Sequence, residues 1–179
     1  MTEASGSPEP AGAPVSDPAI VAQTIARLRD EQDFNLGLAA GLVAALIGAA
    51  LWAGVTIVTK YQIGWMAVGV GFLVGFAVRR FGRGIEPRFG YLGAALALVG
   101  CALGNLFAVL GIVAGHESVS FFSLLGQVRW TAVPRIMAAT FNPMDVLFYG
   151  IALYEGYKLS FRQLTTSELG LPGPAGPGA

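Results

Sequence analysis

The sequence predicts an all-α membrane protein with four transmembrane helices, an N-terminal amphipathic helix, and short interfacial helices between the third and fourth spans. Hydrophobic residues make up 54% of the chain and charged residues only 12%, which is about half the charged fraction of an ordinary soluble domain. Three long stretches, 36–59, 61–78 and 89–115, contain no charged residue. A helix of about 20 residues is long enough to cross the hydrocarbon core of a bilayer. The first three spans are therefore predicted over residues 36–59, 61–80 and 89–115.

The chain before the first span divides into two segments of different composition. Residues 1–16 are rich in Pro, Ala, Ser and Gly and contain no Lys or Arg, unlike the positively charged start of a signal peptide, and we expect a disordered tail. Asp17 and Pro18 then provide an N-cap and a proline at the first helical position. We expect residues 17–34 to form a cytoplasmic amphipathic helix on the membrane surface. The alternative is a solvated helical linker.

Positively charged residues are divided unequally between the two ends of the spans. With the N-terminus inside, the inner side receives eight of them: Arg27, Arg29, Arg79, Arg80, Arg83, Arg88, Lys158 and Arg162. The outer side receives three: Lys60, Arg129 and Arg135. The positive-inside rule then predicts that both termini lie in the cytoplasm. The alternative interpretation of the arginines in RRFGRGIEPR (79–88) is a phosphate or lipid-headgroup site.

The region between the third and fourth spans, residues 116–141, mixes Phe, Leu and Trp with Ser, Gln and Arg, and Pro134 divides it. We expect two short interfacial helices whose apolar side lies in the headgroup zone. The alternative is that this aromatic surface docks another subunit.

The fourth span is predicted from the start signals of a helix. Asn142 is a good N-cap, Pro143 suits the first helical position and Asp145 places an acid in the first turn. From 143 to 161 is 19 residues, or about 28 Å at about 1.5 Å per residue. The four spans form one membrane domain over residues 35–162, followed by a disordered tail over 163–179. Because the continuous apolar run of the fourth span is short, a re-entrant segment is the alternative.

Two sets of glycines are candidates for helix packing: Gly93, Gly100, Gly104 and Gly111 in the third span, and Gly71 and Gly75 in the second. The four in the third span follow spacings of seven, four and seven, which places them on one helical face. Small residues arranged in this way let helix backbones approach closely in lipid. Such packing joins helices of one chain or of two copies, and the sequence does not distinguish these cases.

Three polar residues within the spans are the candidate functional residues: Glu155, Asn105 and Lys158. An ionisable group at membrane depth is costly enough to suggest a function. Lys158, however, lies three residues after Glu155, and we favour an ion pair between them near the inner interface. We expect Asn105 to form an interhelical hydrogen bond.

Enzymatic and nucleic-acid functions are not predicted. One His and one Cys do not provide metal-ligand spacing, so we expect no metal, no cofactor and no catalytic residue. A net charge of zero argues against a nucleic-acid partner.

Two stretches, YQIGWMAVGVGFLVGFAVRRFGRGI (61–85) and DVLFYGIALYEGYKLSFR (145–162), resemble a recurring type of small bacterial membrane protein with four predicted spans. The resemblance implies a location in the bacterial inner membrane and no particular activity. We therefore expect a non-catalytic accessory, scaffold or assembly subunit of a membrane complex, whose partners are the lipid bilayer and other membrane subunits or further copies of itself. The alternative is a small transporter or channel component that uses Glu155 in a polar path.

Overall fold

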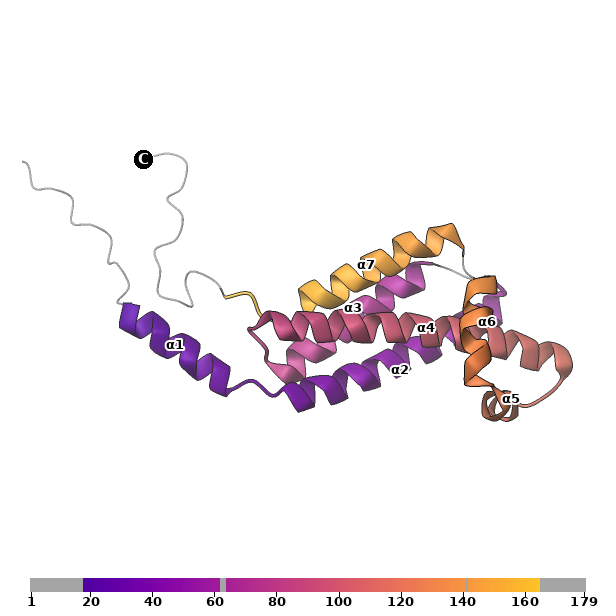
Figure 1. Ribbon diagram of the computed structural model, residues 1–179, viewed down its shortest axis with the longest axis horizontal. Helices are drawn as coiled ribbons and strands as arrows, with labels where there is room; N and C mark the ends of the chain where they lie inside the picture. The colour runs from indigo at the N-terminus through magenta and orange to yellow at the C-terminus, as the bar shows by residue number, and fades with distance from the viewer. Residues whose placement is uncertain (1–17, 62–63, 141, 165–179) are drawn as a thin grey trace, which may run out of the picture. The chain divides into compact units, whose positions relative to one another are not determined.

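The computed structural model describes residues 18–61, 64–140 and 142–164, and it is all-helical over those residues (Figure 1). The chain divides into two units, Met1–Asp30 with Gln163–Ala179, and Glu31–Arg162. The helix described in the first unit is α1 (Pro18–Asp30), in which no residue is buried. The expected N-cap Asp17, the tail over 1–16 and the chain from residue 165 onward lie outside the described residues.

Four long helices build the second unit: α2 (Phe34–Thr59), α3 (Trp65–Gly82), α4 (Pro87–Glu117) and α7 (Pro143–Leu159). α3 and α4 contact each other, and each of them also contacts both α2 and α7. The backbones of α2 and α7 stay apart, on different sides of this central pair (Figure 1).

Three of these helices, α2, α3 and α4, are each long and apolar enough to cross a membrane, which confirms the prediction of an all-helical chain with several candidate membrane spans. α2 and α4 begin two residues earlier than predicted, and α4 also ends two residues later. α3 begins at Trp65 rather than at residue 61. Lys60 adopts the left-handed conformation (φ 59°) and ends α2.

The fourth span differs from its prediction. α7 ends at Leu159 and has 17 residues, or about 26 Å at about 1.5 Å per residue, which is short of the roughly 30 Å hydrocarbon core. The helix before it, α6 (Val133–Thr140), meets it at a bend of 109°, and only the bent pair taken together passes as a fourth candidate span. The expected start signals explain the bend, since Asn142 and Asp145 form a capping box that starts a new helix at Pro143.

Two short helices lie between α4 and α7, as predicted. α5 (Phe121–Gln127) and α6 are separated by the 3-10 turn η1 (Trp130–Ala132). The ring of Phe121 packs edge-on against Phe107 of α4, with the centroids 5.9 Å apart, and fastens α5 to the long helix. The interfacial position of both short helices stays a prediction.

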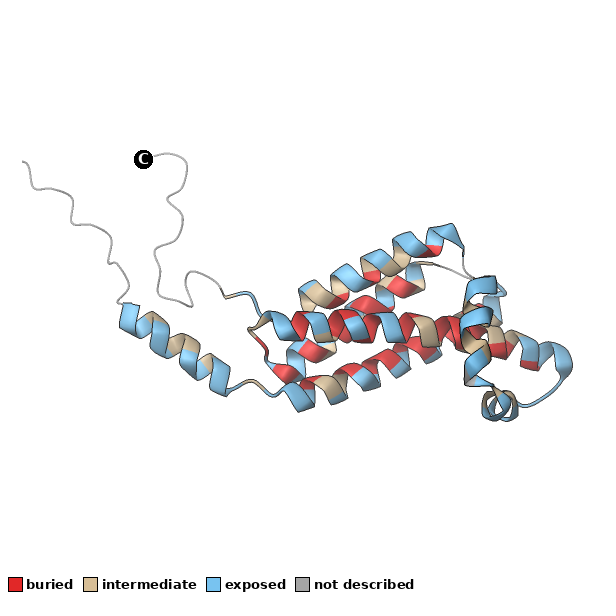
Figure 2. Ribbon diagram, viewed as in Figure 1, coloured by how far each residue is buried: buried red, intermediate tan, exposed pale blue. Residues whose placement is uncertain are grey.

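Buried residues occupy the facing sides of the four long helices (Figure 2). The core consists mainly of small and medium side chains, Ala and Val above all, with Trp52 and Phe89 as its largest members. The outward sides are apolar as well, and they expose large side chains such as Leu51, Phe72 and Val99. A helix that is apolar on all sides suits a lipid environment.

Candidate functional site

Glycines on α3 bring α7 into backbone contact. A Cβ added at Gly71 would lie 2.5 Å from the carbonyl oxygen of Ala152 and 2.8 Å from its Cα. One turn further on, a Cβ at Gly75 would lie 3.1 Å from the carbonyl oxygen of Glu155 and 2.8 Å from Cβ of Leu159. Both contacts depend on the absence of a side chain on α3.

Glycines also join α4 to α7. Gly93 faces the carbonyl oxygen of Gly156 and the hydroxyl of Ser160, and a Cβ on Gly156 would lie 2.8 Å from both Gly93 O and Ala97 Cβ. The sequence reasoning did not single out Gly156. Ala152 and Gly156 form a small residue pair four positions apart, which is the signal that would have identified it. We call the contact of α7 with α3 and α4 through these residues the glycine seam.

The remaining glycines of α4 face other helices. Cβ atoms added at Gly100 and Gly104 would meet Val70 Cγ1 at 2.7 Å and Trp52 Cε3 at 3.0 Å. Gly111 faces the side chain of Ile57. The predicted stripe of α4 therefore contacts α7 near its start and α2 and α3 further along, and all of these contacts lie within one chain.

Asn105 joins α4 to α6. Its side chain is 1% exposed, and its Nδ2 donates a hydrogen bond of 3.2 Å to Thr140 Oγ1. Thr140 in turn donates to the carbonyl oxygen of Ile136, 3.0 Å away. Asn105 thus forms an interhelical hydrogen bond with one of the short helices.

Further buried polar groups lie in the same half of the unit, and the sequence reasoning missed them. Trp52 Nε1 and Thr56 Oγ1 are buried and have no hydrogen-bond partner among the described residues. Asp145 is 8% exposed and accepts a hydrogen bond of 2.9 Å from the Asn142 N–H. It borders a recess of about 210 Å³ that Thr140 also lines. The sequence marks Asp145 only as a helix-start signal, and its burial becomes visible only in the folded unit.

Glu155 and Lys158 lie toward the other end of α7. Glu155 is half-buried and Lys158 is exposed. In place of the expected ion pair, which the structure does not form between these two described residues, the ammonium of Lys158 lies 5.3 Å from the ring centroid of Tyr154. Such a cation–π contact suits a lysine side chain that extends toward the membrane–water interface.

The structure does not bring Asn105 and Glu155 together. Gly93 is at the level of Gly156, next to Glu155, and Asn105 lies 12 residues further along α4. That distance is about 18 Å at about 1.5 Å per residue. The two polar residues therefore occupy different depths of the unit.

The end of the unit that carries the arginines is held together at one loop, between α3 and α4. The Asp33 N–H donates to Gly82 O (3.0 Å), and the Arg162 N–H donates to Gly84 O (2.7 Å). The Ile85 N–H donates to Gln32 Oε1 (3.2 Å). The segments before α2 and after α7 thus both bind this loop.

Among the described residues, no group of three or more His, Cys, Asp or Glu side chains is gathered in a way that would hold a metal ion. Comparisons with protein-family models, with curated proteins and with solved structures each find no match.

Proposed function

We propose that this chain is a non-catalytic accessory or assembly subunit of a membrane complex, placed in the bacterial inner membrane with both termini in the cytoplasm. The glycine seam carries the proposal. Because backbone meets backbone at Gly71 and Ala152 and again at Gly93 and Gly156, this side of the unit is filled by its own helices. A filled unit with an apolar outer surface suits a structural partner in lipid.

The transporter alternative finds less support in the geometry. A polar path through one chain would have to connect Glu155 with Asn105, and these residues lie about 18 Å apart along the unit. The carbonyl oxygen of Glu155 is itself packed against Gly75. The glycine seam thus leaves α3 and α7 closely packed next to Glu155.

α5 provides the proposed docking surface. Phe121 fastens it to α4, and the next residue, Phe122, is 79% exposed. An exposed aromatic side chain beside a fixed one is a suitable anchor for a partner, because aromatic residues dominate the centres of interfaces.

The test is purification of the full chain from its native membrane in mild detergent, with the co-purifying proteins identified and the particle sized. We expect other membrane proteins in stoichiometric amounts. Phe122→Ala should lower their yield several-fold. Tyr61→Ala is the matched control, since Tyr61 is 75% exposed at the same end of the unit, and it should leave the yield unchanged.

A defined homo-oligomer without other proteins would contradict the proposal. A flux assay of Glu155→Gln in vesicles would then test the transporter alternative. That alternative requires that the variant loses flux while the homo-oligomer stays assembled.

A further inference from the structure

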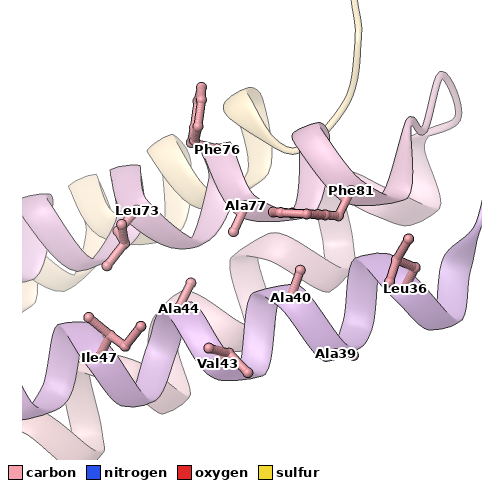
Figure 3. Close-up of a pocket in the computed structure, with 10 residues that line it drawn as sticks. All are labelled: Leu36, Ala39, Ala40, Val43, Ala44, Ile47, Leu73, Phe76, Ala77 and Phe81. Carbon is pink, nitrogen blue, oxygen red and sulfur yellow. The ribbon is translucent and has the colours of Figure 1, made fainter.

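An apolar groove runs between α2 and α3 on the outer surface of the unit (Figure 3). Its volume is about 470 Å³, which is in the range of small-molecule binding sites, roughly 300–1,000 Å³. Ala40 and Ala44 of α2 and Ala77 of α3 point toward one another across it (Figure 3). The lining residues are Leu36, Ala39, Ala40, Val43, Ala44, Ile47, Leu73, Phe76, Ala77 and Phe81.

The groove has the depth of one leaflet. It extends along α2 from Leu36 to Ile47, a separation of 11 residues or about 16 Å at about 1.5 Å per residue. Half of the roughly 30 Å hydrocarbon core is about 15 Å. An acyl chain that enters at the arginine end of the unit would therefore reach the midplane where the groove ends.

Positive charge lies at the end of the groove where the headgroup would be. Arg80 lies three and four residues after Ala77 and Phe76, so it continues the same face of α3. Its Cζ is 5.8 Å from the ring centroid of Phe81, which lines the groove. Arg83 follows one turn later and is exposed.

The carboxylates nearest in sequence to this end are engaged elsewhere. Glu86 Oε2 pairs with Arg88 Nε at 2.8 Å, and Asp33 Oδ1 accepts the Leu36 N–H at 2.8 Å as the cap of α2. Arg80 and Arg83 have no carboxylate partner among the described residues. The Arg80 guanidinium, next to Phe81 at the end of the apolar groove, complements an anionic headgroup with an acyl chain, and Arg83 adds positive charge just beyond the end of α3.

We propose that the groove between α2 and α3 binds one anionic phospholipid of the surrounding leaflet. One acyl chain lies along Ala40, Ala44 and Ala77, and the phosphate binds Arg80, with Arg83 adding charge. The small residues leave room for the chain, while Phe76 and Phe81 border it. This site goes beyond the proposed docking surface on α5, which lies at the opposite end of the unit.

The test is native mass spectrometry of the full chain, extracted from vesicles of phosphatidylcholine with phosphatidylglycerol and delipidated in steps. We expect one phosphatidylglycerol per chain to be retained beyond phosphatidylcholine. Arg80→Gln should weaken this retention by about fivefold, the factor that corresponds to roughly 1 kcal/mol per arginine near an anionic surface. Arg135→Gln is the control, an exposed arginine in α6, and it should have no effect.

A second pair of variants tests the groove itself. Ala40→Phe fills it and should abolish retention of the lipid. Gly69→Phe adds the same side chain to a smaller hollow of about 250 Å³, lined also by Gly48, Leu51 and Phe72, and should preserve retention. Should Ala40→Phe fail to fold, Arg80→Gln still decides the matter, since its side chain is exposed.

Three outcomes would overturn the proposal. Equal retention of phosphatidylcholine and phosphatidylglycerol would show that the anionic headgroup is not recognised. Unchanged retention in Arg80→Gln and Ala40→Phe would place the lipid elsewhere. The third outcome is a dimer that carries no bound lipid and that both Ala40→Phe and Gly69→Phe separate into single chains. It would show that a helix of a second copy lies along α2 and α3 in place of the lipid.

Discussion

Two glycines of α3 lie only two positions apart and have opposite environments. Gly71 faces the backbone of Ala152, whereas a Cβ at Gly69 would meet nothing within 4 Å. A helix turns by about 100° per residue, so positions two apart lie on different sides. Glycine content alone therefore does not reveal which glycines pack.

Replacing Gly71 with Ala should destabilise the unit by about 1–3 kcal/mol, as overpacking of an interior does. The neighbouring atoms at Ala152 are backbone atoms and move away only if α7 shifts. The matched control, Gly69→Ala, should be neutral or more stable by up to about 1 kcal/mol, because Ala is the better helix former. Unfolding of both variants in mixed micelles gives the comparison. Equal stabilities would contradict the packing role of Gly71.

Asn105 and Thr140 form a second contact that is testable at the residue scale. A double-mutant cycle with Asn105→Ala and Thr140→Val should give a coupling energy of about 0.6 kcal/mol, the average for hydrogen bonds between membrane helices. The control cycle pairs Asn105→Ala with Thr24→Val, because the Thr24 hydroxyl bonds only within α1. We expect that cycle to be additive. A coupling of zero between Asn105 and Thr140 would show that α6 is not held by this bond.

At the scale of elements, the break between α6 and α7 decides whether the chain crosses the membrane a fourth time. α7 packs against both α3 and α4, and the Arg162 N–H binds Gly84 O at the arginine end. A helix that begins beside α6 and ends at that loop passes from one end of the unit to the other. On this path we expect α7 to cross the membrane, and the re-entrant segment stays the alternative.

Single cysteines test the crossing in a Cys101→Ala background, since the native Cys101 is buried. Ser120→Cys and Gln163→Cys, both at exposed positions, should react with a membrane-impermeant maleimide from opposite sides. Tyr61→Cys should react from the same side as Ser120→Cys, because α2 and α4 finish at the same end of the unit. If residues 120 and 163 react from the same side, α7 is re-entrant.

At the scale of the whole molecule, the packed helices belong to Glu31–Arg162, and α1 contributes no buried residue. A chain of residues 31–162 should therefore unfold at the same midpoint as the full chain in the same micelles. It should also retain the contacts of Gln32 and Arg162 with the loop between α3 and α4. A lower midpoint would assign the terminal segments a stabilising role.

The sequence by itself determined the class of the protein, the three long spans and the start of α7. Hydropathy, charge segregation and capping are local properties, because each depends on residues within one helix or next to its end. The glycine stripe of α4 was also visible, since the face of a helix follows from spacing alone.

Only the tertiary structure decided which helix of the chain each glycine meets. It also decided the burial of Asp145, the contact at Gly156, the cation–π position of Lys158 and the groove beside Arg80. Each of these depends on residues far apart in the sequence, and on the crossing of helices whose outer sides are as apolar as their inner sides. In lipid, hydrophobicity does not select the packed face, so the fit of side chains and backbones decides it.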